Sequence, residues 1–187
     1  MLLLVLCGTI ISICMGMRQS LGLFMRPMTL DVGISAASFG FAIALQNMVW
    51  GLSQPFIGAL ADRYGSRPVL IGTSISFAAG LAVMSVSTGP LLLDVAGFLL
   101  GLGTAGTSFG VLMGVVTRAS PPERRSQNVG IVAACGSLGT MVLAPVGQAL
   151  IDGRGWQAAL LVFAGIACAM LLLSFPLRGL ARRMGAA

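Results

Sequence analysis

One basic residue interrupts an apolar stretch near the start of the chain. Arg18 stands eight residues before Arg26, which places it about 12 Å below the outer end of a helix that rises 1.5 Å per residue. A charge at that depth in a bilayer costs about 2.5–3.5 kcal/mol and normally faces a cavity or a partner. A guanidinium binds a carboxylate through two parallel hydrogen bonds. We therefore predict that Arg18 contacts an anionic small molecule; the alternatives are an ion pair with Asp94 and snorkelling to the outer surface.

A polar and aromatic stripe accompanies this arginine. Gln46, Asn47, Trp50 and Gln54 recur at spacings of three and four, so they share one face of a helix. Amides within a membrane span either join helices or line a polar path, and both interpretations stay open. We include Gln46, Asn47 and Trp50 with Arg18 in the predicted substrate-binding set.

Asp94 is the acid within an apolar segment, four residues after Pro90. A carboxylate near a helix start is stabilised by the helix dipole. The sequence leaves a structural role and an ion-coupling role open for it.

The sequence lacks the residues that covalent catalysis or a metal site would need. Gly106 to Gly110 reads G-x-S-x-G, but a serine nucleophile needs a base, and the chain has no histidine while its eleven basic residues are all arginine. The four cysteines, Cys7, Cys14, Cys135 and Cys168, lie in apolar stretches without a CxxC pair, which argues against a disulfide framework or a zinc site. The chain is predicted not to be an enzyme, and no cofactor or metal is implied.

The elements that position these residues follow from composition. The chain is 57% hydrophobic and 9% charged, whereas a soluble domain carries about 25% charged residues. The bilayer is the solvent that such a composition fits, and each span must satisfy its own backbone hydrogen bonds. The net charge of +6 comes from dispersed arginines, so we expect membrane lipid and not nucleic acid as the partner of this charge.

Six segments are long and apolar enough to span a bilayer, at about 20 residues per span. They are residues 2–25, 37–58, 68–87, 91–117, 128–150 and 156–177. Ser38 and Asn128 are predicted to open the second and fifth segments.

Orientation follows from the arginines. One side of the membrane receives Arg63, Arg67, Arg118, Arg124, Arg125, Arg178, Arg182 and Arg183, and the other receives Arg26 and Arg154. By the positive-inside rule both termini are predicted to be cytoplasmic, in an inner or plasma membrane.

An internal repeat appears when the sequence is shifted by 90 residues. Pro55 then meets Pro145, Asp62 meets Asp152, and Gly65 meets Gly155. Because three spans separate the copies, they have opposite orientations. This predicts a 3+3 inverted repeat, which is common inside secondary transporters; chance similarity between apolar segments is the alternative.

The loop after the second segment reads GALADRYGSRPVL, from Gly58 to Leu70. It resembles the G-x-L-A-D-R-x-G-R-[KR] pattern between helices 2 and 3 of the major facilitator superfamily, through Gly58, Asp62, Arg63, Gly65 and Arg67. PPERRSQNVG and DGRGWQAALL resemble further loops of that family. The resemblance implies an all-α fold in which residues 1–187 form the N-terminal six-helix domain, half of a twelve-helix transporter. It also implies that this loop latches two halves together.

Within that family, the stretch from Gly97 to Gly103 has glycine where proton-coupled drug antiporters carry an arginine, which disfavours proton-driven drug export. GMRQSLGLFMRPM, from Gly16 to Met28, is similar to the carboxylate branch that includes oxalate/formate and monocarboxylate transporters. The resemblance therefore implies secondary transport of small organic anions by alternating access. The alternatives are export of another solute and a truncated or non-transporting six-helix protein. The second six-helix half is expected either downstream in the same chain or in a second copy.

Overall fold

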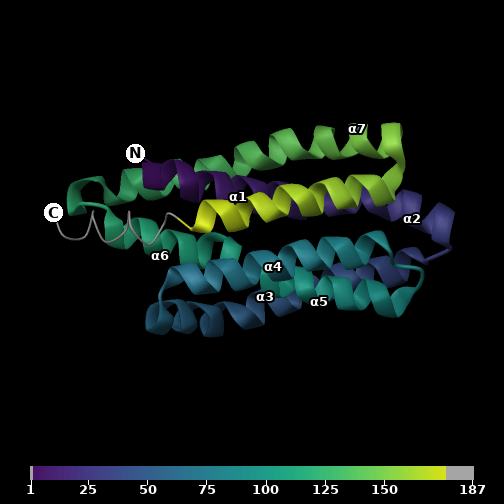
Figure 1. Cartoon of the computed structure of the whole chain (residues 1–187), viewed down its shortest axis with the longest axis horizontal. Coiled ribbons are helices and arrows are strands. Elements are labelled where there is room, and N and C mark those ends of the chain that lie inside the picture. The colour runs from purple at the N-terminus through teal and green to yellow at the C-terminus, as the bar shows by residue number, and fades with distance from the viewer. Residues whose placement is uncertain (1, 176–187) are drawn as a thin grey trace.

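Long helices make up the structure. The computed structural model describes residues 2–175, and within that range it contains no strand. The elements are α1 (Leu2–Ser20), η1 (Leu21–Phe24), α2 (Met25–Val32), α3 (Ala36–Tyr64), α4 (Ser66–Ser85), α5 (Pro90–Thr107), α6 (Phe109–Ala119), η2 (Pro122–Arg124) and α7 (Arg125–Ser174). They lie side by side along one direction (Figure 1). Arg178, Arg182 and Arg183, which support the predicted orientation, lie outside the described residues.

Four stretches of the described chain are long and apolar enough to cross a membrane. They are Leu2–Val32, Ser66–Ser85, Pro90–Ala119 and Pro122–Ser174. α3 has 29 residues but is not among them, since it carries the polar stripe that includes Gln46, Asn47 and Gln54. The described part of the chain is therefore all-helical, and its long apolar helices are those of a multi-pass membrane protein.

The first long stretch continues further than predicted. α1 runs through the single 3-10 segment η1 into α2, and the chain leaves the helix only at Gly33, with φ 72°. The predicted end of the first segment at residue 25 is wrong. The helix continues because Pro27 lies in the first turn of α2, where its missing N–H is tolerated. The predicted cap of the next helix is also shifted: Ser35 is the N-cap, and its Oγ accepts a hydrogen bond from the Ser38 N–H at 3.0 Å.

α7 reverses direction part-way along its length (Figure 1). Gly155, at φ 81° and ψ 162°, breaks the helical conformation, and we call residues 125–154 the first arm and residues 156–174 the second arm. Gly65, between α3 and α4, has φ 90° and ψ 155°. Two glycines in the same unusual conformation thus form two sharp reversals of the chain.

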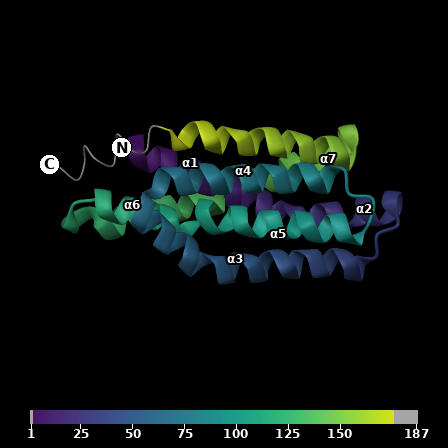
Figure 2. The ribbon, with the colours of Figure 1, turned by 60° about the horizontal axis from the view of Figure 1, so that its bottom comes forward.

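α5 lies between α3 and α4 (Figure 2). Glycines allow its backbone to approach both neighbours. A Cβ on Gly97 would lie 2.5 Å from the Ala42 carbonyl oxygen of α3, and one on Gly103 would lie 2.5 Å from Cβ of Phe77 of α4. In a membrane, such close van der Waals packing holds helices together.

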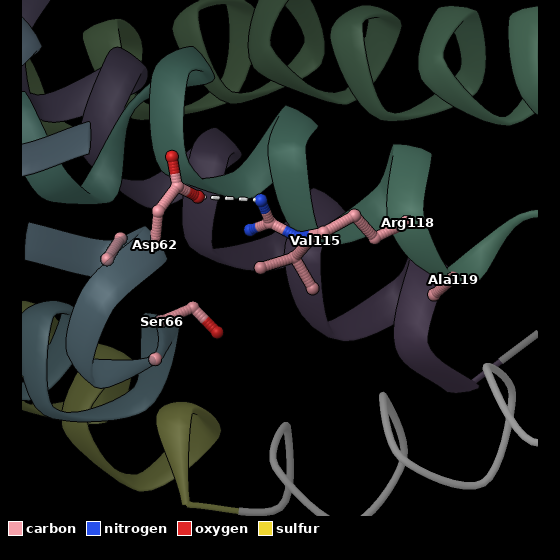
Figure 3. Close-up of a pocket in the computed structure, with 7 residues that line it drawn as sticks. Asp62, Ser66, Val115, Arg118 and Ala119 are labelled. Atoms are coloured by element: carbon pink, nitrogen blue, oxygen red, sulfur yellow. Dashed lines mark hydrogen bonds and ion pairs between the residues drawn. The ribbon is translucent and has the colours of Figure 1, made fainter. Parts of the chain in front are cut away.

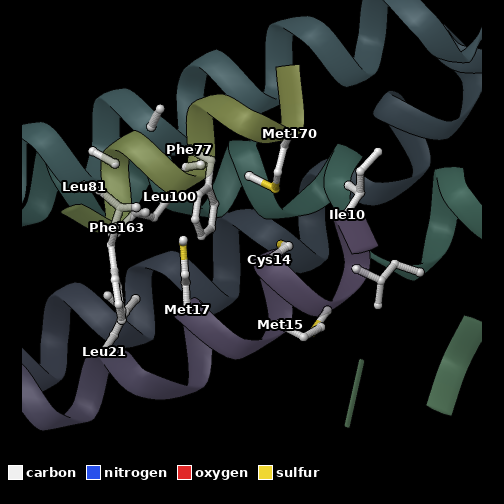
Figure 4. Close-up of a cluster of buried hydrophobic side chains, with 14 of the residues drawn as sticks. Ile10, Cys14, Met15, Met17, Leu21, Phe77, Leu81, Leu100, Phe163 and Met170 are labelled. Carbon is white, nitrogen blue, oxygen red and sulfur yellow. The ribbon is translucent and has the colours of Figure 1, made fainter. Parts of the chain in front are cut away.

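α1 and η1 pack against the two arms of α7. The Ser12 hydroxyl of α1 donates to the Cys135 carbonyl of the first arm. The Phe24 ring of η1 meets the Phe163 ring of the second arm edge-on, with centroids 6.0 Å apart. Side chains of α4 join the same buried cluster, in which Phe77 and Leu81 lie near Phe163 and Met170 (Figure 4).

Most of the buried positions in two pairs of helices recur at an interval of 90 residues. In α1 they are Leu3, Leu6, Cys7, Ile10, Ile11, Cys14, Met15, Gly16 and Met17, and in α5 they are Leu93, Ala96, Gly97, Leu100, Gly101, Thr104, Ala105, Gly106 and Thr107. In α4 they are Val69, Leu70, Thr73, Ser74, Phe77, Gly80 and Met84, and in the second arm they are Ala159, Leu160, Phe163, Ala164, Ala167, Met170 and Ser174. Helices that lie 90 residues apart in the sequence therefore bury corresponding faces.

Candidate functional site

Arg18 lies near the C-terminal end of α1, partly buried and beside α3. Its Nη2 donates a hydrogen bond to Oδ1 of Asn47. Its guanidinium carbon lies 4.4 Å from the centroid of the Trp50 ring, within the range of a cation–π contact. The structure thus brings together three of the four residues that the sequence predicts to bind substrate.

Both partners of Arg18 are held by further hydrogen bonds. The Asn47 Nδ2 donates to the Ile43 carbonyl at 2.8 Å, which leaves its Oδ1 to accept from Arg18. The Trp50 Nε1 donates to Oγ of Ser108 at 3.1 Å. Ser108 has an extended conformation at the break between α5 and α6, so Trp50 connects Arg18 to that break.

Ser108 is a site residue that the sequence analysis did not identify. Its G-x-S-x-G context was considered only for nucleophilic chemistry. The glycines around it, at positions where a helix can break, were the signal that could have located this contact.

Gln46, the fourth predicted residue, lines a cavity with Arg18. The cavity has a volume of about 230 Å³ and lies between α1, η1 and α3. Its lining residues are Arg18, Gln19, Leu21, Gly22, Ile43, Gln46 and Asn47. Gln46 is only 2% exposed, and neither its Nε2 nor the Nε of Arg18 has a hydrogen-bond partner. A cationic side chain and a buried amide side chain therefore line one small space, although the two unpaired nitrogens are themselves covered by neighbouring atoms.

Asp94 does not neutralise Arg18. Within residues 2–175 the salt bridge that forms is between Asp62 and Arg118, and the Oδ1 of Asp94 is buried without a hydrogen-bond partner. The alternative in which Arg18 and Asp94 form an ion pair is not what the structure contains.

The motif loop forms a second, separate site. Asp62 lies 15 residues beyond Asn47 on α3, which corresponds to about 22 Å along the helix axis. Its Oδ1 accepts a hydrogen bond from Nη1 of Arg118 in α6 at 2.8 Å (Figure 3). A cavity of about 280 Å³ lies beside this pair, lined by Ala61, Asp62, Gly65, Ser66, Val115, Arg118 and Ala119. In the sequence, Arg118 indicates only orientation, and its pairing with Asp62 was not predicted.

The other motif residues are arranged around this turn. The Arg63 guanidinium carbon lies 5.4 Å from the Tyr64 ring centroid, and that of Arg67 lies 4.9 Å from the Phe175 ring centroid. Gly58 has open space around the position of a Cβ, and Gly65 supplies the positive φ of the turn.

The fold and the two sites define a class: a helical multi-pass membrane protein with an internal polar cavity and a charged interhelical turn. The family model of the Major Facilitator Superfamily matches residues 4–183. The chain belongs to the Major Facilitator Superfamily, as its motif predicted. Members of this family are transporters of small molecules and not enzymes.

Curated relatives of this chain bear names that refer to different small molecules or to drug resistance. The tetracycline resistance protein, class C, of Escherichia coli is 30% identical over 129 residues, covering 69% of this chain and 32% of that protein. Monocarboxylate transporter 11 of Homo sapiens is 30% identical over 170 residues, covering 88% and 36%. The multidrug resistance protein MdtH of Salmonella paratyphi B is 31% identical over 123 residues, covering 65% and 30%. The chain spans about a third of the length of these relatives.

Proposed function

We propose that residues 1–187 form the N-terminal six-helix half of a secondary transporter that carries small carboxylates by alternating access. The observation that carries this proposal is the Arg18 cavity. It places one cation and an unpaired amide within the membrane-spanning part of the protein. A charge there is costly unless it serves a pathway or a partner.

Six crossings and a 3+3 inverted repeat are the architecture of this proposal. The two arms of α7 count as separate crossings because the chain reverses at Gly155. The 90-residue recurrence of buried positions supports a pseudo-two-fold relation that exchanges the first three helices with the last three. Contacts agree with this exchange: α1 packs on the first arm as α5 packs on α3. Such repeats surround midplane sites in secondary transporters.

Both termini are proposed to be cytoplasmic, in the inner or plasma membrane. Arg63, Arg67, Arg118 and Arg124 belong to the helix ends and turns where α3 meets α4 and α6 meets α7. Arg26, in α2, and Arg154, just before Gly155, lie toward the opposite ends of their helices. An excess of arginine marks the cytoplasmic side.

Arg18, Gln46, Asn47 and Trp50 are the proposed substrate contacts. A carboxylate suits Arg18 because its guanidinium can donate two parallel hydrogen bonds to two oxygens. The name of monocarboxylate transporter 11, which aligns with 88% of this chain, supports this class of cargo.

The motif residues Gly58, Asp62, Arg63, Gly65 and Arg67 are proposed to form the conformational latch against a second half. The exposed Asp62–Arg118 pair at this turn supports that role. Asp94 keeps two proposed roles, ion coupling and a structural carboxylate at the start of α5, and its unpaired Oδ1 is compatible with either.

The second six-helix half is proposed to be fused downstream or to be a second copy of this chain. An antibody against residues 118–128 would detect the native protein in its own membrane. A band at about twice the 19.1 kDa of this chain would indicate a fused half, and a band at 19.1 kDa would leave the paired copies or a non-transporting protein.

A second candidate function is export of a drug-like solute. Two relatives named for drug resistance, the tetracycline resistance protein and MdtH, favour it. The two functions differ in the charge of the cargo, so one assay separates them.

The test uses the full-length protein that contains this chain, reconstituted in liposomes. We expect counterflow of lactate but not of its uncharged analogue lactamide, and no transport of tetracycline. Arg18→Ala should abolish lactate counterflow while the protein still inserts in the membrane. Unchanged lactate kinetics in Arg18→Ala would refute the assignment, and tetracycline transport alone would establish the second candidate.

A further inference from the structure

Five arginine side chains gather at one end of the helix bundle. Two of them flank the turn between α3 and α4, and the other three belong to the end of α6 and the start of α7. The two regions contact each other, since Nη1 of Arg118 donates a hydrogen bond to Oδ1 of Asp62 at 2.8 Å (Figure 3). The five residues, which we call the arginine patch, are Arg63, Arg67, Arg118, Arg124 and Arg125.

The charge of residues 2–175 is divided unevenly between the two ends of the bundle. At the end that carries the patch, its five arginines are accompanied by two acids, Asp62 and Glu123, so the net charge is +3. Toward the opposite end there are two arginines and three acids, which give a net charge of −1. They are Arg26, Arg154, Asp31, Asp94 and Asp152. An anionic partner is therefore attracted to the patch and not to the opposite end.

Most of the charge of the patch has no counterion in the protein. Within residues 2–175 the patch forms a single salt bridge, in which Arg118 pairs with Asp62. Four of the five guanidinium groups are thus left without a carboxylate partner in that range. Arg124 and Arg125 are both exposed, so their hydrogen-bond donors are accessible to an anion from outside the protein.

The patch lies at the level where the apolar helices end. Arg67 is next to the first residue of the apolar stretch Ser66–Ser85, and Arg118 is next to the last residue of Pro90–Ala119. Both stretches are long and apolar enough to cross a membrane. The ends of such spans lie among the lipid headgroups, so headgroups are the nearest molecules around the patch.

Exposed aromatic rings lie beside two of the arginines. The guanidinium carbon of Arg63 lies 5.4 Å from the centroid of the Tyr64 ring, and that of Arg67 lies 4.9 Å from the centroid of the Phe175 ring. Tyr64 is 61% exposed and Phe175 is 50% exposed. Aromatic residues such as tyrosine are enriched at the interface between membrane and water, which supports the same level for the patch.

We propose that the arginine patch binds the headgroups of anionic glycerophospholipids. The acceptors are the phosphodiester oxygens, which match the paired donors of a guanidinium. Clusters of four to eight basic residues at the end of a membrane span attract anionic lipids in this way. The inference concerns a lipid partner and holds whichever solute the protein carries.

The experiment measures thermal unfolding of the full-length protein in detergent micelles as phosphatidylglycerol is added. We expect phosphatidylglycerol to raise the unfolding temperature and the zwitterionic phosphatidylcholine to have little effect. Arg124→Gln and Arg125→Gln remove patch charges that are not part of the proposed latch. Each should raise the phosphatidylglycerol concentration for half-maximal stabilisation by about fivefold, and added salt should raise it as well.

Matched controls are available at the opposite end of the bundle and in the ligand. Arg26→Gln and Arg154→Gln also remove exposed arginines and should leave the response to phosphatidylglycerol unchanged. Glycerophosphoglycerol carries the same phosphodiester without acyl chains. It should neither stabilise the protein nor displace the lipid at the same concentration, because the binding partner is a lipid at the membrane surface.

Each contrary outcome overturns the inference. Equal stabilisation by phosphatidylglycerol and phosphatidylcholine would show that the headgroup charge is not recognised. Equal responses of Arg124→Gln, Arg125→Gln and Arg26→Gln would show that the patch is not the binding surface. Stabilisation by glycerophosphoglycerol as strong as by the lipid would indicate a site for a soluble phosphate compound. Lactate transport is measured separately, so failure of the proposed function and failure of this inference are distinguishable.

Discussion

Gly65 and Gly155 have nearly the same backbone conformation, at φ 90°, ψ 155° and φ 81°, ψ 162°. They lie 90 residues apart, at the two sharp reversals that join α3 to α4 and the first arm of α7 to the second. This region of backbone space is essentially restricted to glycine. The repeat in the sequence therefore coincides with a repeated requirement for glycine in the structure.

Replacing either glycine should strain the turn. We expect Gly65→Ala and Gly155→Ala each to lower the stability of the full-length protein by about 1–3 kcal/mol, measured as a lower thermal unfolding temperature in detergent. Gly153→Ala is the control, because Gly153 is helical and has open space around a Cβ. Equal unfolding temperatures for Gly155→Ala and Gly153→Ala would contradict the assigned conformation.

Contacts between α3 and α5 should not tolerate a methyl group. A Cβ on Gly97 or Gly101 would lie 2.5 Å from the Ala42 carbonyl oxygen or 2.7 Å from the Gln46 carbonyl oxygen, and backbone atoms cannot move aside as side chains do. We expect Gly97→Ala and Gly101→Ala each to lower the free energy of unfolding of the full-length protein by about 1–3 kcal/mol. Gly110→Ala, whose nearest atom would be 4.0 Å away, should be near neutral in the same unfolding measurement.

The Asp62–Arg118 pair should contribute little to stability. Its side chains are 67% and 57% exposed, and exposed ion pairs are worth about 0–1 kcal/mol. A double-mutant cycle with Asp62→Ala and Arg118→Ala should give a coupling free energy below about 1 kcal/mol, decreasing as salt is added. A coupling free energy of several kcal/mol, insensitive to salt, would show that the pair is buried in the complete transporter.

We expect the aromatic ring of Trp50, which contacts Arg18, to contribute more to lactate affinity than its indole N–H does. Trp50→Phe keeps an aromatic face for the cation and loses only the hydrogen bond to Ser108. We expect Trp50→Ala to weaken lactate affinity about fivefold, consistent with a cation–π contact worth about 1 kcal/mol, and Trp50→Phe to weaken it less. If both variants lose the same affinity, the hydrogen bond to Ser108 is the more important contact.

Cysteine labelling tests the proposed orientation. Arg124 and Arg154 are both exposed, in the α6–α7 connection and just before Gly155. With native cysteines removed, a membrane-impermeant maleimide added to intact cells should label Arg154→Cys and not Arg124→Cys. The reverse pattern would place the termini outside.

Residues that favour turns, above all glycine and proline, made much of the fold predictable from the sequence. Glycine and proline mark chain reversals through their own backbone preferences, so the turn at Gly65 and the break between segments 128–150 and 156–177 follow from the sequence. The same reasoning misplaced the end of the first helix, because Pro27 sits where a helix start accepts proline. Nothing in the local sequence indicates that Trp156 is buried, at 3% exposed, or that its Nε1 donates to Oδ2 of Asp31 at 2.8 Å.

The pairing within the candidate site was less predictable. Helical spacing places Asn47 and Trp50 on one face of α3, but nothing in that spacing identifies Arg18 as their common partner. That contact depends on how α1 crosses α3, which is set by packing between distant segments. Likewise, Arg118 reaches Asp62 only because α6 lies beside the end of α3.

The close contact of α3 with α5 has a mechanical consequence. At Gly97 and Gly101, the backbone of α5 approaches the backbone of α3 directly. No lipid chain fits between the two helices at these positions. We therefore expect α3 and α5 to move together in any conformational change, with Asp62 toward one end of α3 and Gln46 near its middle. A displacement of the charged turn would then reach the polar cavity through the paired helices themselves, without a series of side chains that change rotamer between the two sites.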